Sequence, residues 1–153
     1  MLRIEVPQRG LFELHHAVFD INGTLAVDGR VLPGVRDRLH TLADLLAIHL
    51  LTAGTHGQLA ELERTLGYPL QLITNGEEKA RYVEQLGAAS VIAFGNGTND
   101  TGMLEKAAIG VAVLSAEGLA SKVLQVADVL AFGPVDALDL VLKPQRLVAT
   151  LRG

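Results

Sequence analysis

The sequence Ala17-Val18-Phe19-Asp20-Ile21-Asn22-Gly23-Thr24 places an aspartate directly after a short apolar run. The run from Ala17 to Phe19 is typical of a buried strand, because it is apolar at successive positions and not only at alternate ones. The asparagine and glycine that follow Asp20 interrupt this strand. Asp20 therefore marks the carboxyl end of the first core strand.

The same order of strand, loop and helix repeats along the rest of the chain. Repeated βα winding predicts an α/β fold, a doubly wound parallel sheet with helices on both faces and right-handed crossovers. We also expect an N-terminal β-hairpin with strands at 4–6 and 12–14, and a small exposed flap over residues 25–34. Pro144 divides the last apolar segment into two short helices. The expected core strands are 17–19, 48–51, 70–73, 91–94, 110–114 and 128–132, and the expected helices before Pro144 are 35–46, 59–66, 77–86, 103–107 and 119–126.

Composition and charge exclude several classes of protein. The 153 residues, 49% of them hydrophobic, are enough for one domain with one core, which we expect to span residues 1–153. The net charge of −4 and the lack of a basic run argue against a nucleic-acid partner. With no cysteine, any metal must be bound by oxygen or imidazole. No segment approaches the ~18 apolar residues of a membrane span. The N-terminus lacks a signal-peptide core, so we expect a cytoplasmic protein.

Polar residues follow the predicted strands or begin the predicted helices at four places. Asp20 ends the first core strand, Thr52 begins a small-residue loop after the second, Lys79 lies near the start of a helix, and the glycine-rich loop 95–100 follows another strand. Ligands of doubly wound sheets bind outside the carboxyl ends of the strands. These places offer a nucleophilic carboxylate, a hydroxyl with backbone N–H groups for an anion, a cation, and a second carboxylate for a metal.

These stretches resemble the four motifs of the haloacid dehalogenase superfamily. Residues 18–25 resemble its first motif, usually Asp-x-Asp-x-Thr after a hydrophobic strand. Leu50-Leu51-Thr52 resembles the second motif and Lys79 the third, and Gly95-Asn96-Gly97-Thr98-Asn99-Asp100 resembles the fourth, usually Gly-Asp-Gly-x-Asn-Asp. All four occur in the order of the family. Glu77-Glu78-Lys79 and the Gly-Asn-Gly loop are similar to the phosphorylation domain of P-type ATPases and to small soluble proteins like it.

The resemblance implies a Mg²⁺-dependent phosphatase that forms an aspartyl phosphate. The intervals in which the superfamily inserts a cap domain are too short for one here, so the resemblance implies an open site. Such a site suits a phosphoprotein, or a phosphorylated small molecule covered by a neighbouring subunit of a homo-oligomer. The implied residues are Asp20, Asn22, Thr52 and Lys79 for catalysis, Gly23, Thr52, Ala53, Gly54 and Lys79 for substrate binding, and Asp20, the backbone carbonyl of Asn22, Asn96 and Asp100 for Mg²⁺.

Two asparagines stand where the superfamily usually has aspartates. Asn22 cannot act as a general acid or base, a role that contributes typically ~10²–10⁴-fold to the rate. We therefore expect slow turnover, least impaired for substrates with good leaving groups. Asn96 replaces a carboxylate ligand, so we expect a reduced affinity for Mg²⁺.

Other interpretations use the same residues. A non-catalytic phosphate-binding or regulatory module would keep the fold without turnover, which the two asparagines favour. A receiver-type signalling domain would need an acidic pair after its first strand and an aspartate after its third, and the sequence has neither. A dinucleotide site is disfavoured because Asp100 occupies the third glycine position of Gly-x-Gly-x-x-Gly. Among the histidines, His56 follows Thr52 closely enough to reach the site.

Overall fold

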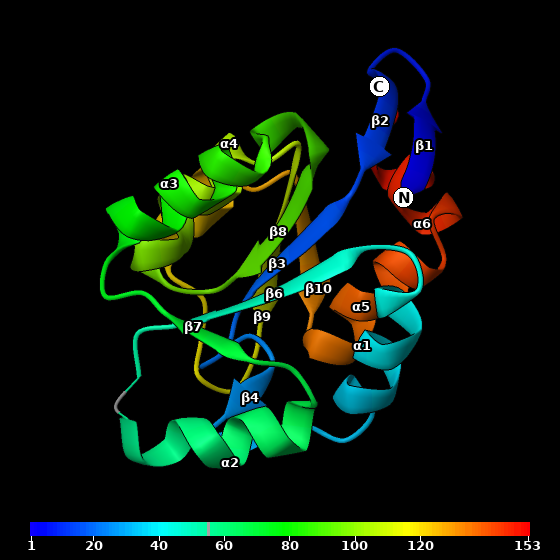
Figure 1. The fold of residues 1–153 in the computed structure, drawn as a ribbon. Coiled ribbons are helices and arrows are strands. Elements are labelled where there is room, and N and C mark those ends of the chain that lie inside the picture. Colours follow the sequence, from blue (N-terminus) through cyan, green and yellow to red (C-terminus); the bar gives the residue numbers. More distant parts are fainter. Residues whose placement is uncertain (55) are drawn as a thin grey trace.

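A six-stranded sheet runs through the middle of the protein, with helices on both of its faces (Figure 1). The structure, a computed structural model, describes residues 1–54 and 56–153. Every neighbouring pair of strands in this sheet is parallel. This confirms the predicted doubly wound parallel sheet. In spatial order the strands are β10 (Val129–Phe132), β9 (Ile109–Leu114), β8 (Val91–Gly95), β3 (His16–Asp20), β6 (Ala47–Thr52) and β7 (Leu70–Leu72).

The central strand β3 is buried on both faces, as its continuous apolar run predicts. Phe19 points to one face and stacks on Phe94 of β8, with ring centroids 4.4 Å apart. Val18 points to the other face and joins a second apolar cluster. Helices α1 (Val35–Ala43) and α5 (Pro134–Leu142) cover the Phe19 face, and α3 (Gly76–Leu86) and α4 (Thr101–Lys106) cover the Val18 face (Figure 1).

An antiparallel hairpin of β1 (Leu2–Val6) and β2 (Gly10–Leu14) precedes the sheet, as predicted. Alternate side chains of this hairpin are buried in the same cluster as α6 (Gln145–Leu151). Pro144 separates α5 from α6, as the sequence predicts. Among the described residues, no helix has the length and apolar character needed to cross a membrane.

The segments beside the core strands are short. Between β3 and α1 lies only a hairpin of β4 (Ala26–Val27) and β5 (Arg30–Val31), and between β6 and α3 lie only α2 (His56–Leu66) and β7. The ranges 1–54 and 56–153 therefore contain no cap domain. The expectation that residues 25–34 form an exposed flap is wrong for the first two of these residues, because Leu25 and Ala26 are buried in the core.

The prediction of a helix over residues 119–126 is also wrong. Only a short 3-10 helix, η3 (Ser121–Gln125), forms there. Ala120 is extended, and its N–H donates to the carbonyl of Asn96 at 2.9 Å, which fixes the start of the segment outside a helix. Leu119 and Val126 still pack against the core, so their spacing reflects burial and not helical turns.

Candidate active site

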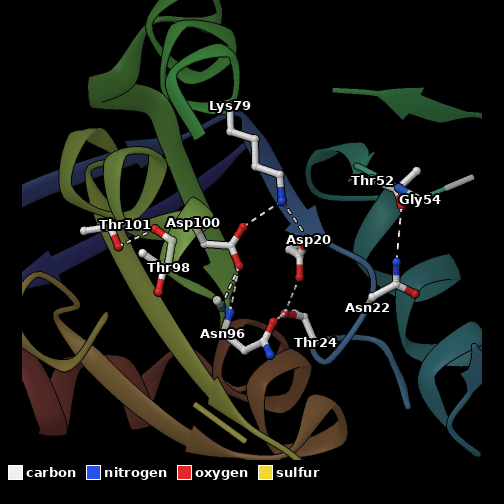
Figure 2. Close-up of polar contacts among 11 residues, drawn as sticks. Asp20, Asn22, Thr24, Thr52, Gly54, Lys79, Asn96, Thr98, Asp100 and Thr101 are labelled. Carbon is white, nitrogen blue, oxygen red and sulfur yellow. Dashed lines mark hydrogen bonds and ion pairs between the residues drawn. The ribbon is translucent and has the colours of Figure 1, made fainter. Parts of the chain in front are cut away.

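The carboxyl ends of three adjacent strands carry the candidate residues to one edge of the sheet. Asp20 is the last residue of β3 and Thr52 the last of β6, and β8 ends at Gly95, where the glycine-rich loop begins. Strands β6 and β8 flank β3 on its two sides. Figure 2 shows the side chains of Asp20, Lys79 and Asp100 converging there.

A buried lysine bridges two buried aspartates. The Nζ atom of Lys79 lies 2.7 Å from Oδ1 of Asp20 and 2.8 Å from Oδ1 of Asp100 (Figure 2). Lys79 comes from the first turns of α3, whose N-terminus is capped because the Asn75 side chain accepts from the N–H of Glu78. Two carboxylates against one ammonium give this cluster a net negative charge, which favours a further cation.

The loop after β8 (residues 95–100) holds Asp100 through its own backbone. Oδ2 of Asp100 accepts hydrogen bonds from the N–H groups of Asn96 at 3.0 Å and Gly97 at 2.9 Å. A Cβ at Gly95 would lie 2.6 Å from the Asp100 side chain, so only glycine permits this close approach. Lys79 and the loop thus fix the orientation of the Asp100 carboxylate, which still has a free lone pair.

Thr24 joins Asp20 to Asn96. Its Oγ1 lies 3.2 Å from Oδ2 of Asp20 and 3.3 Å from Oδ1 of Asn96 (Figure 2). A hydroxyl has a single proton, so it can donate to only one of these oxygens at a time. Two oxygen acceptors therefore share one hydroxyl proton.

This arrangement suits a hard cation. Mg²⁺ prefers oxygen ligands and is usually bound by one or two carboxylates, with water and phosphate oxygen completing the shell. The described ranges contain no group of three histidine, aspartate or glutamate side chains placed to hold a metal. The oxygens of Asp20 and Asn96, which Thr24 joins, nevertheless offer Mg²⁺ one carboxylate and a second oxygen donor, so the residues present fit this ion.

Gly23 has to be a glycine in this structure. Its φ is +83°, and a Cβ there would lie 2.2 Å from Nδ2 of Asn96. Its carbonyl accepts a hydrogen bond of 2.7 Å from the hydroxyl of Ser115, which follows β9. The Asn96 amide in turn donates to the carbonyl of Gly118 at 3.3 Å. The loop after β9 therefore holds both Gly23 and Asn96 in place.

Thr52 is buried and offers a hydroxyl proton. Its Oγ1 accepts from the N–H of Gly54 at 3.1 Å and from Nδ2 of Asn22 at 3.5 Å (Figure 2). Within the described residues, its own proton has no acceptor, so it is free to donate to an anion. The N–H of Gly54 is already used by Thr52, whereas Ala53 is exposed beside it.

Burial alters the protonation of this cluster. Loss of solvent and the charge of Asp100 raise the pKa of Asp20 to about 6, although Lys79 and Thr24 act in the opposite direction. Burial alone would lower the pKa of Lys79, but the carboxylates of Asp20 and Asp100 outweigh it and raise the pKa. Lys79 therefore stays charged, while Asp20 is a stronger base than an exposed aspartate.

The sequence of this chain matches a known protein family. A family model for haloacid dehalogenase-like hydrolases matches residues 47–131, which include Thr52, Lys79 and Asp100. The chain belongs to this family. An uncharacterized protein of Methanocaldococcus jannaschii, MJ0073, is 44% identical to this haloacid dehalogenase-like hydrolase over 62 residues, 40% of this chain and 67% of that protein.

Several solved structures share the fold of this chain. A subfamily III A hydrolase from Legionella pneumophila has a TM-score of 0.71 at 15% identity, covering 92% of this chain and 88% of that one. The 3-deoxy-D-manno-octulosonate 8-phosphate phosphatase of Moraxella catarrhalis, solved with magnesium, phosphate and KDO, has a TM-score of 0.64 at 17% identity, covering 91% and 94%. A zinc-transporting PIB-type ATPase has a TM-score of 0.64 at 22% identity, covering 78% of this chain and 20% of that one.

The structure of this haloacid dehalogenase-like hydrolase brings together most of the residues predicted from sequence. Asp20, Lys79, Asp100 and Asn96 lie in one connected cluster, with Gly23 against Asn96, and Asn22, Thr52 and Gly54 form a second group beside it. The side chain of His56 lies outside the described residues. Sequence reasoning did not assign a role to Thr24, although it is the last position of the first motif, and it missed Ser115 and Gly118, which no spacing indicated.

A second polar cluster lies at the opposite end of β3. Nδ1 of His16 is 3.1 Å from Nε2 of His49 on β6, and Nδ1 of His49 is 2.8 Å from the hydroxyl of Tyr82 on α3. Burial lowers the pKa of both histidines, and the charge of His15 lowers that of His16 further, as the charge of His16 does for His49. This chain of hydrogen bonds joins β3, β6 and α3 on the side of the sheet's amino ends, away from the candidate active site.

Proposed function

We propose that this protein is a Mg²⁺-dependent phosphohydrolase that works through an aspartyl phosphate on Asp20. The observation that carries the proposal is the position of the Asp20 carboxylate, with one oxygen 2.7 Å from Lys79 and the other 3.2 Å from the hydroxyl of Thr24, which also contacts Asn96. The carboxylate is held at a strand end, in a buried cluster with a cation. This is the placement that a nucleophile attacking a phosphate dianion requires.

The chemistry of Asp20 has two steps. In the first, a carboxylate oxygen forms a bond to phosphorus as the bond from phosphorus to the leaving group breaks, and the leaving group departs with its oxygen. In the second, water attacks the phosphorus of the acyl phosphate and gives inorganic phosphate and the free carboxylate. Lys79 holds Asp20 in place throughout and reduces the repulsion between the carboxylate and the incoming phosphate.

The other residues divide between the metal and the phosphoryl group. Asp20, Asn96, Asp100 and the carbonyl of Asn22 would hold Mg²⁺, which would offset the negative charge of the phosphate. Thr52 donates its free hydroxyl proton to a phosphoryl oxygen. Gly23, Ala53, Gly54 and Lys79 complete the substrate site on either side of Asp20.

We infer slow turnover of alkyl phosphates, because Asn22 cannot protonate the leaving group. General acid catalysis contributes typically ~10²–10⁴-fold, so acyl and aryl phosphates, whose leaving groups need less protonation, should react best. The described residues place no domain over the site, which leaves it open to a phosphorylated small molecule or a phosphoprotein.

The experiment is an assay of phosphate release from acetyl phosphate and p-nitrophenyl phosphate, with Mg²⁺ and with EDTA. We expect Mg²⁺-dependent release in the native protein and none in Asp20→Asn. Asp37→Asn, which changes an exposed aspartate of α1, is the matched control and should keep the native rate. Equal rates in the native protein and Asp20→Asn would reject the proposal.

The Asn22→Asp variant tests the cause of the slow turnover. It restores a proton donor beside the site, so the rate with an alkyl phosphate should rise about 10²-fold or more, with a smaller gain for acetyl phosphate. An equal gain for both substrates would show that leaving-group protonation does not limit the native protein.

A phosphate-binding module without turnover is the second candidate, and Asn22 and Asn96 favour it. In that case calorimetry would detect binding of inorganic phosphate in the presence of Mg²⁺, and Lys79→Met would abolish the binding. No substrate would be hydrolysed, even by the Asn22→Asp variant.

A further inference from the structure

Strand β10 leaves one edge of the main sheet open. It pairs only with β9, and its four residues are Val129, Leu130, Ala131 and Phe132. Exposed edge strands of monomeric proteins are usually protected by charged residues, proline or bulges. This strand contains none of these, and the side chain of Phe132 is 73% exposed.

Apolar side chains extend from this edge over one face of the sheet. Val129 and Ala131 point into the core under α5, so Leu130 and Phe132 point to the opposite face. Leu114 of β9 pairs beside Phe132, and Leu124 of η3 comes shortly before β10 in the chain. All four are exposed, with Leu124 at 52% and Leu130 at 41%.

The other side of the edge carries two opposite charges. A groove of about 300 Å³ follows the edge itself, lined by Leu130, Ala131 and Phe132 of β10 and by Asp136, Leu140 and Arg146 of α5 and α6. In the part of the chain that the structure describes, neither Asp136 nor Arg146 forms an ion pair. Asp139, another acidic residue of α5, is already paired with Arg38 and Lys143.

The two charges lie toward opposite ends of β10. Helix α5 begins two residues after Phe132 and returns antiparallel to the strand, so Asp136 in its first turn lies near the carboxyl end of β10. Arg146 belongs to α6, beyond the far end of α5, and so lies toward the amino end of β10. The groove therefore has an acidic end and a basic end.

We propose that β10 is the interface with a second copy of this chain. A twofold axis perpendicular to the sheet would place the two β10 strands antiparallel, joining the sheets of both copies into one. That symmetry brings the acidic end of each groove against the basic end of the other, so Asp136 faces the partner subunit's Arg146 and Arg146 faces the partner subunit's Asp136. The edge is thus complementary to itself in charge.

The same symmetry limits the register, because residues directly opposite in an antiparallel pair point to the same face. We place Leu130 opposite the partner's Phe132, which centres the strand pair on Ala131. The apolar side chains of the two copies then cover one another on one face of the joined sheet. The ion pairs between Asp136 and the partner's Arg146 form on the other face. Two strands, β9 and β8, separate β10 from β3, so the interface leaves Asp20 uncovered, and the inference does not depend on the proposed function.

Sedimentation velocity over a wide range of protein concentration tests the interface. We expect a dimer in the native protein and a monomer in Phe132→Glu, which buries a charge opposite Leu130. Leu11→Glu is the matched control, because Leu11 is 58% exposed on the N-terminal hairpin, and it should stay dimeric. A native protein that is monomeric at every concentration, or a dimer unaffected by Phe132→Glu, overturns the proposal.

Charge reversal tests the arrangement of the two copies. Asp136→Arg and Arg146→Asp each place two like-charge pairs across the interface, so each should weaken dimerisation at least about tenfold. The double variant restores opposite charges and should recover the native affinity. Failure of the double variant to recover, with the fold verified by circular dichroism, overturns the twofold arrangement.

Discussion

The ammonium group of Lys79 lies 2.8 Å from a carboxylate oxygen of Asp100, and neither side chain is exposed to solvent. The same ammonium is 2.7 Å from Asp20, so one cation balances two buried carboxylates that come from distant parts of the chain. Removing one partner of a buried ion pair is far more destabilising than losing an exposed pair. The stability of the fold and the placement of the proposed nucleophile therefore depend on the same contacts.

Lys79→Met should lower the free energy of unfolding by about 3–5 kcal/mol, because Asp20 and Asp100 would then face each other without a cation. The protein has no tryptophan, so urea unfolding is best followed by circular dichroism. Lys79→Met/Asp100→Asn removes the repulsion as well, and an asparagine oxygen can still accept from the loop N–H groups. The double variant should therefore be more stable than Lys79→Met alone, and a further loss of stability would contradict this account.

The pKa of Asp20 predicts a pH dependence of stability in the metal-free protein. Because its pKa rises from 3.8 to about 6 on folding, the unfolded chain loses the Asp20 proton first, and stability falls as pH rises through that interval. Asp20→Asn has no such proton. We therefore compare the free energies of unfolding of Asp20→Asn and the native protein in EDTA. The difference should shift in favour of Asp20→Asn by about 2–3 kcal/mol when the pH is raised from about 4 to about 7. Urea unfolding at these two values measures the gain, and a constant difference would show that Asp20 titrates normally.

Asn96→Asp should strengthen Mg²⁺ binding about tenfold, since a carboxylate oxygen replaces an amide oxygen beside Asp20. A ligand that binds only the folded state stabilises it, so the unfolding temperature rises with the concentration of Mg²⁺. The size of this rise measures the affinity for Mg²⁺. Asn99→Asp adds the same charge at an exposed position of the same loop and serves as the control. If the two variants respond to Mg²⁺ alike, Asn96 is not a metal ligand.

The His16 and His49 pair should make the fold sensitive to acid. Burial lowers both pKa values below 6.5, so the unfolded chain is protonated first and stability is lost as pH falls below that value. In the double variant His16→Gln/His49→Gln, the loss of stability between about pH 7 and pH 5 should be smaller than in the native protein. His40→Gln, at an exposed position of α1, is the control for removing a histidine. An unchanged loss in the double variant would exclude the pair as its source.

Much of the fold follows from the sequence because burial on both faces of a parallel sheet leaves a strong signal. The run ending at Asp20 is apolar at successive positions, and such a strand can be accommodated only in the middle of a covered sheet. Once the strands are parallel, their carboxyl ends must share one edge. That Asp20 and the loop ending at Asp100 lie at the same edge of the sheet is therefore predictable without coordinates.

What the sequence did not predict depends on contacts between segments with no pattern of their own. The hydroxyl of Ser115 reaches the carbonyl of Gly23 only because β9 lies next to β8, two positions from β3. The segment around Leu119 has the spacing of a helix, yet the hydrogen bond from Ala120 to Asn96 keeps its start extended. Tertiary contacts of this kind override local propensity.

The central place of β3 also has a consequence for biosynthesis. Both of its neighbours, β6 and β8, come later in the chain, and β8 is complete only at Gly95. Ribosomes add about 5–20 residues per second, so several seconds pass between the synthesis of β3 and that of β8. During this time the apolar run of β3 lacks one of its two neighbouring strands. The emerging chain is thus most prone to aggregation, and most dependent on chaperones, well before its last residues are translated.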